Sequence, residues 1–157
     1  MPVVHALSGG IGECWVRCWN QRQVAALAET HHQTFAQNGI PLGSAAFGES
    51  LQGFFASFPD VRATIDDVMA VGDKVLTLVV YCATQTGTYQ GIEPTGRAIR
   101  VTGLELFLLV DGCVIHHWHE MDHLAILLQL SAPRRATGLR PRAALHCATG
   151  SRPPPRP

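Results

Sequence analysis

The sequence has no acidic residue after position 131, although six of its twelve Lys and Arg residues lie there. The preceding body holds the other six basic residues and all twelve acidic ones, so its formal charge is −6 and that of the tail is +6. Nucleic-acid-binding folds need a basic face to replace the counterions of the phosphates. The acidic body excludes that class, and we expect no nucleic-acid partner.

Paired cysteines and long apolar runs are also missing. The five cysteines are odd in number and lack the paired spacings of zinc ribbons and disulfide frameworks, so we expect reduced thiols and a cytoplasmic protein. No apolar run reaches the roughly 20 residues that a membrane span needs, and the first residues lack the pattern of an export signal. We therefore expect no membrane partner.

The hydrophobic pattern changes its period along the chain. Helical spacing predicts an amphipathic helix over 13–28, with a weak point near Asn20, and a second over 48–58. Alternation with β-branched residues then predicts strands over 62–70, 74–86, 97–110 and 113–121, joined by turns at Gly72-Asp73 and Asp111-Gly112. A short helix follows over 124–130. The order predicts an α+β fold with helices packed on an antiparallel sheet.

Two of the predicted strands are apolar on both faces, at 76–81 and 104–110. We expect the helices to cover one face of the sheet and a second copy of the chain to cover the other, in a homodimer or homotetramer. Residues 132–157 contain six of the ten prolines, six arginines and no aromatic residue. This composition predicts one folded domain over 1–131 and a basic, Pro/Arg-rich disordered tail over 132–157.

Four motifs resemble one known family in their order and spacing. They are FPDVRATIDD (58–67), VGDKV (71–75), GIEPTGR (91–97) and HWHEMDHL (117–124), the last followed by LLQL (127–130). Over residues 13–131 the chain resembles SnoaL-like polyketide cyclases of the nuclear-transport-factor-like superfamily. The resemblance implies a cone-shaped α+β barrel, with N-terminal helices on a curved antiparallel sheet and a deep apolar pocket. It also implies antibiotic or other secondary metabolism, with no metal or organic cofactor.

The resemblance further implies intramolecular aldol ring closure of an aromatic, apolar polyketide, with Asp122 as the acid/base. Asp122 also stands where a strand gives way to a helix, so a helix-capping role is the simpler alternative. Gln85 stands where many relatives carry histidine. It would orient a substrate carbonyl by hydrogen bonding or serve only the strand, and it cannot shuttle a proton.

The residues themselves indicate further candidates. Glu105 lies in an apolar strand and is either a pocket acid or the partner of Arg97, Arg100 or an interface residue. His116 shares strand parity with Trp118 and Asp122, which makes it the histidine expected beside the base. The predicted aromatic walls of the pocket are Trp15, Trp118, Phe54 and Tyr81.

Three alternatives stay open at this level. The run His119–His123 matches the zinc-protease pattern of two histidines around a glutamate, but it begins in a strand pattern, so we expect no metal site. The fold would also suit a related hydroxylase, isomerase or epoxide hydrolase, because one pocket carboxylate serves several chemistries. A non-catalytic module that binds small molecules is the third possibility.

The paired His31-His32 is expected at an exposed helix end.

Overall fold

The computed structural model of the protein describes residues 2–132. In chain order the elements are α1 (Pro2–Gln21), the 3-10 helix η1 (Val24–Glu29), β1 (His31–Gln37), β2 (Ile40–Pro41), α2 (Ser44–Ser57), β3 (Arg62–Val71), β4 (Lys74–Thr84), β5 (Ala98–Val110), β6 (Cys113–Met121) and α3 (His123–Ser131). The expected α+β fold class is confirmed. The predicted disorder of the tail concerns residues outside the described range.

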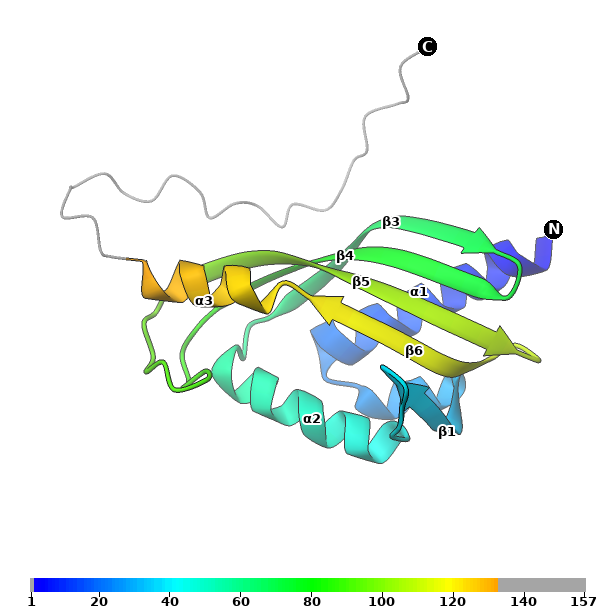
Figure 1. The fold of residues 1–157 in the computed structure, drawn as a ribbon, viewed down its shortest axis with the longest axis horizontal. Coiled ribbons are helices and arrows are strands. Elements are labelled where there is room, and N and C mark those ends of the chain that lie inside the picture. Colours follow the sequence, from blue (N-terminus) through cyan, green and yellow to red (C-terminus); the bar gives the residue numbers. More distant parts are fainter. Residues whose placement is uncertain (1, 133–157) are drawn as a thin grey trace, which may run out of the picture.

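The six strands form one curved sheet in the order β2-β1-β6-β5-β4-β3, which does not close into a complete barrel (Figure 1). Strands β3 to β6 form the expected antiparallel meander, and the turn residues Gly72, Asp111 and Gly112 have positive φ angles. Strand β1 pairs with β6 in parallel, so the sheet is mixed.

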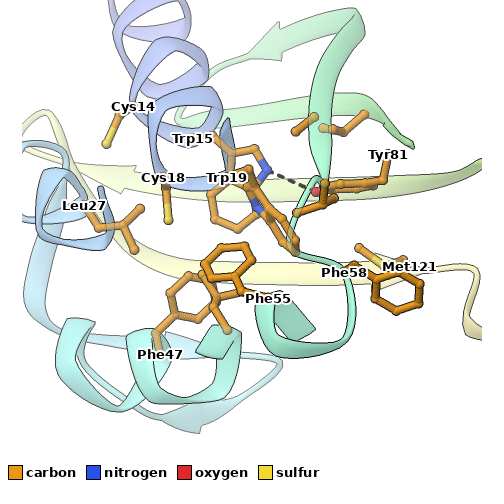
Figure 2. Close-up of a cluster of buried hydrophobic side chains, with 14 of the residues drawn as sticks. Cys14, Trp15, Cys18, Trp19, Leu27, Phe47, Phe55, Phe58, Tyr81 and Met121 are labelled. Atoms are coloured by element: carbon orange, nitrogen blue, oxygen red, sulfur yellow. Dashed lines mark hydrogen bonds between the residues drawn. The ribbon is translucent and has the colours of Figure 1, made fainter. Parts of the chain in front are cut away.

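One face of the sheet carries the hydrophobic core. Figure 1 shows α1 lying across the sheet and α2 running beside the β1–β6 end, while α3 follows directly from β6. Trp15 and Trp19 of α1 are almost fully buried against Tyr81 of β4 (Figure 2). This inner face also holds the polar groups described below. The helices among residues 2–132 lack the combination of length and apolar character needed to cross a bilayer.

The first helix ends close to the predicted weak point: α1 stops at Gln21, Arg22 has a φ of 60°, and η1 follows. The helix begins well before residue 13, although Gly9, Gly10 and Gly12 lower helix propensity.

Strands β1 and β2 were not predicted, and the placement of His31 at an exposed helix end was wrong. His31 begins β1 and is only 5 % exposed. The strand HHQTFAQ offers little apolar alternation. The turn after it did carry a sequence signal, the pair Asn38-Gly39, which is typical of a type I′ hairpin turn. In the structure both residues have the positive φ angles that this turn requires.

Candidate functional site

A pocket of about 140 Å³ opens between the inner face of the sheet and helices α1 and α2. Its walls are mostly apolar and aromatic, and its two ionisable side chains are His119, near the end of β6, and His123, the first residue of α3. The lining residues are Trp19, Gln37, Phe47, Ser50, Leu51, Phe54, His119, Met121 and His123. An apolar hollow with a few polar groups is the usual form of a small-molecule site.

Behind His119 lies Glu105, whose side chain is completely buried. The Nδ1 atom of His119 is 2.8 Å from Oε1 and 2.7 Å from Oε2 of Glu105, and Nε2 of His117 is 2.8 Å from Oε2. Since Nδ1 of His119 faces Glu105, its Nε2 is the nitrogen left for a ligand. The register explains the meeting, because β5 and β6 pair Glu105 with His119 and Phe107 with His117 on one face.

A second chain of hydrogen bonds holds the other side of the carboxylate. The Tyr81 hydroxyl donates to Oε1 of Glu105 at 2.7 Å, and Nε1–H of Trp15 donates to the Tyr81 oxygen at 3.2 Å (Figure 2). Gly103 makes this approach possible, since a Cβ atom there would lie 3.0 Å from the Tyr81 ring and 3.1 Å from the carbonyl oxygen of Glu120. Glu105 is thus fixed by three different side chains.

The residues of this network differ in their favoured protonation states. Burial alone would raise the pKa of Glu105, but the charge of His119 and the hydrogen bonds from His117 and His119 outweigh it and lower the pKa to about 2. Burial opposes protonation of His119, yet the charge and hydrogen bond of Glu105 raise its pKa overall. For His117 burial prevails and the pKa is lowered. The favoured state is an ion pair of Glu105 and His119 beside a neutral His117.

The second pocket histidine has a different environment. Nδ1 of His123 is 2.7 Å from the hydroxyl of Tyr89, which is buried in the loop between β4 and β5. Burial, followed by the charge of His119, lowers the pKa of His123, and the nearby Glu120 and Asp122 offset part of this. His123 therefore favours the neutral form while His119 favours the charged one.

Glu105, His117 and His119 are also of the types that bind metals, and their ligand atoms lie within 4.8 Å of one another. Atoms bound to one metal at 2.0–2.1 Å would be about 2.9–3.4 Å apart. The observed 2.7–2.8 Å contacts are instead hydrogen-bond lengths, and four such contacts already occupy the carboxylate oxygens. The geometry fits a proton-sharing network better than a metal centre.

The predicted site residues lie in five different places. Phe54 lines the pocket, while Trp15, Tyr81 and Glu105 belong to the buried network behind it. Glu105 pairs with histidines, and Arg97 instead donates to the carbonyl oxygens of Gln129 and Leu130 at the end of α3.

His116 and Trp118 are not brought to the pocket. They pair with Leu108 and Leu106, so they lie on the outer face of the sheet, where their rings contact each other. Gln85 is completely buried, and its amide bonds only to the loop residues Gly87, Ile92, Glu93 and Thr95. This matches the structural alternative for Gln85.

Asp122 is the exposed N-cap of α3, and its Oδ1 accepts a hydrogen bond from the backbone N–H of Ala125 at 2.8 Å. It stands in the chain between Met121 and His123, which both line the pocket, but it does not line the pocket itself. The capping alternative thus describes its contacts, and its catalytic role stays a prediction.

Four residues of the two hydrogen-bond networks were not among the predicted site residues: His117, His119, His123 and Tyr89. Glu105 in a strand of apolar residues was a usable signal, since a buried carboxylate needs partners. The only histidines that alternation could place on one face of the neighbouring strand were His117 and His119 as one pair, or His116 alone on the other face.

Known proteins agree with this architecture. Residues 11–130 match the family described as SnoaL-like polyketide cyclase. TsrD from Streptomyces laurentii is 25 % identical, with 82 % of this chain and 97 % of TsrD covered and a TM-score of 0.74. IdmH from Streptomyces antibioticus, named as a candidate polyketide cyclase, is 26 % identical, with 80 % and 96 % covered and a TM-score of 0.69.

AclR from Streptomyces galilaeus, named as a candidate hydroxylase, is 24 % identical, with 83 % of this chain and 85 % of AclR covered and a TM-score of 0.69, so it supports the fold alone. No curated protein matches the sequence. The family match covers most of the chain and agrees with the fold described above. The chain belongs to the SnoaL-like polyketide cyclase family.

Proposed function

We propose that this protein is a polyketide cyclase that closes a ring by intramolecular aldol condensation without a cofactor. The observation that carries the proposal is an imidazole, His119, which faces an apolar pocket and is held from behind by the buried carboxylate of Glu105. Aldol closure needs no redox step. It requires removal of a proton from a carbon beside a carbonyl, attack on a second carbonyl, and protonation of the new alkoxide.

His119 suits the last of these steps. The ion pair with Glu105 keeps a proton on the imidazole, and the apolar walls strengthen its attraction for a developing oxyanion. The pocket volume is close to that of a cavity of about 150 Å³ that holds one benzene molecule. We therefore expect the ring being closed to enter the pocket, while rings already formed remain at its mouth beside Phe54.

The resemblance assigns the proton-accepting role to Asp122. A carboxylate at the N-cap of α3 would have to meet the substrate at the pocket mouth, one residue from His123. Replacing Asp122 with asparagine keeps a good N-cap and removes the charge, so this change separates catalysis from capping.

The test is conversion of an anthraquinone-type polyketide ester by the purified protein with no added cofactor. The aldol product is an isomer of the substrate, so the two have the same mass and are separated by chromatographic retention, while mass detection confirms that no atoms were lost or gained. We expect His119→Gln to lower turnover by about 100-fold, within the range for loss of a general acid. His116→Gln is the matched control, because it changes the same residue type on the same strand but on the outer face.

Absence of product with the native protein would overturn the proposal and favour another reaction or simple binding. Equal losses in the His119 and His116 variants would show that the pocket is not the site. A large loss in Asp122→Asn with little change in His119→Gln would return the acid/base role to the aspartate.

A further inference from the structure

A second imidazole, that of His123, lines the pocket and has no role in the reaction proposed above. His123 is exposed to solvent, whereas His119 is half-buried, so we take His123 to stand nearer the mouth of the pocket. Both rings border one cavity of about 140 Å³, so a single bound ring would lie within reach of both.

The position of His123 is fixed from two directions. Its Nδ1 is bonded to the Tyr89 hydroxyl, which leaves Nε2 as the nitrogen available to a ligand. Asp122 caps the helix that His123 begins, which sets where the side chain leaves the backbone. Tyr89 is itself buried against Phe54 and Phe58, so its hydroxyl is a rigid support.

The charges around the two rings differ. His119 faces Glu105 of β5 and has Glu120 beside it on β6, and the neutral His117 bonds to the same carboxylate of Glu105. His123 faces Tyr89 from the β4–β5 loop, His119 from β6, and the carboxylates of Glu120 and Asp122. A proton on His123 is further opposed by the positive end of the α3 dipole, because His123 is the first residue of that helix.

We propose that His123 is a second catalytic residue, which takes the proton from the substrate carbon while His119 gives one to the carbonyl oxygen. This rests on the proposed cyclase function. The C–H bond breaks as the proton moves to Nε2 of His123, and the resulting enolate carbon forms the new C–C bond. The electron pair of the attacked C=O bond goes to its oxygen, which takes the proton from Nε2 of His119.

One turnover leaves His123 charged and His119 neutral, so the pair must exchange protons before the next. His123 is exposed and releases its proton to water, and His119 takes a proton from water when the product leaves, which the negative charge of Glu105 favours. The opposite pKa directions of the two histidines fit these roles, since groups whose environments separate their pKa values are the usual acid/base partners.

The first measurement is an NMR pH titration of the protein with labelled histidine, with assignments from His119→Gln and His123→Gln. We expect His119 to titrate above pH 6.5 and His123 below it. In His119→Gln the pKa of His123 should rise, because the neighbouring charge is gone. Titration of both at the same pH, or no change of His123 in the His119 variant, would overturn the pairing.

The second measurement is the pH–rate profile of cyclisation. His123→Gln should lower kcat by about 100-fold and abolish the acidic limb of the profile, with the melting temperature nearly unchanged. Tyr89→Phe, which keeps the ring packing, should shift that limb and leave KM unaffected. The control is His32→Gln, an exposed histidine of β1 outside the pocket lining.

The two proposals fail differently. No turnover by the native protein overturns the cyclase function and with it the role of His123. Turnover that is lost in His119→Gln but retained within twofold in His123→Gln overturns the role of His123 alone. Retention of the acidic limb in His123→Gln would have the same meaning.

Discussion

Replacing Glu105 with glutamine removes the charge at the centre of the buried network while keeping the size of the side chain. Tyr81, His117 and His119 would then face a group that no longer attracts them as an anion. Breaking a buried ion pair costs about 3–5 kcal/mol. For a fold of this size, about 3–4 °C of melting temperature accompanies each kcal/mol, so we expect a loss of about 9–20 °C near pH 6.

The loss should depend on pH with a definite sign. Because Glu105 raises the pKa of His119 in the folded state, the stability from this pair is complete below pH 6.5 and declines as the pH rises through the raised value. The lowered pKa of Glu105 adds a second decline as the pH falls from 4.5 toward 2. The difference between the native protein and the variant should therefore be largest between these limits and smaller at pH 9.

Calorimetry from pH 5 to 9 measures this difference. Glu49→Gln on the exposed side of α2 is the control and should change stability by less than about 0.5 kcal/mol. A Glu105→Gln melting temperature within 2–3 °C of the native value, or one that differs equally at pH 6 and 9, would refute the ion-pair assignment. A change that small corresponds to less than the roughly 3–5 kcal/mol that breaking a buried ion pair costs.

Three further results are expected. The pKa of His31 is lowered to about 4 by burial and by nearby His117, so native stability should fall by up to about 3 kcal/mol between pH 6.5 and 4, and urea titrations should show a smaller fall in His31→Gln. Treatment with a chelator should leave activity and melting temperature unchanged. If the chelator instead removed activity and added Zn²⁺ restored it, Glu105, His117 and His119 would be identified as metal ligands. Leu104, 47 % exposed on the outer face, should lie in a homo-oligomer interface, so light scattering should find an oligomer that Leu104→Glu dissociates; a monomeric native protein would contradict this.

The local pattern was enough to predict most of the fold. The strands β3 to β6 and the helices α2 and α3 follow from period, turn residues and stop signals, and their ends fall within a few residues of the prediction. Strand β1 could not be found in this way, because its sequence is mostly polar and its pairing with β6 connects residues about 80 positions apart. Parallel pairing at long range leaves little trace in the alternation of a single segment.

The site was harder to predict because it depends on contacts between elements. The sequence showed that Glu105 was an unusual residue, but its partners come from another strand. The alternation that grouped His116, Trp118 and Asp122 was valid only inside the strand. β6 ends at Met121, so Asp122 has already left the alternation and points according to the helix that it caps.

A single inserted residue decides which histidines reach Glu105. The hairpin at Asp111-Gly112 pairs Leu109 with Val114, and continued without interruption it would set Glu105 opposite Trp118. A bulge between the pairs Leu109–Val114 and Leu108–His116 adds Ile115 to β6. Glu105 therefore lies opposite His119, and His117 faces inward with it. Because a shift of one residue exchanges the two faces of a strand, the bulge sends His116 and Trp118 outward and builds the proton-sharing network from their neighbours.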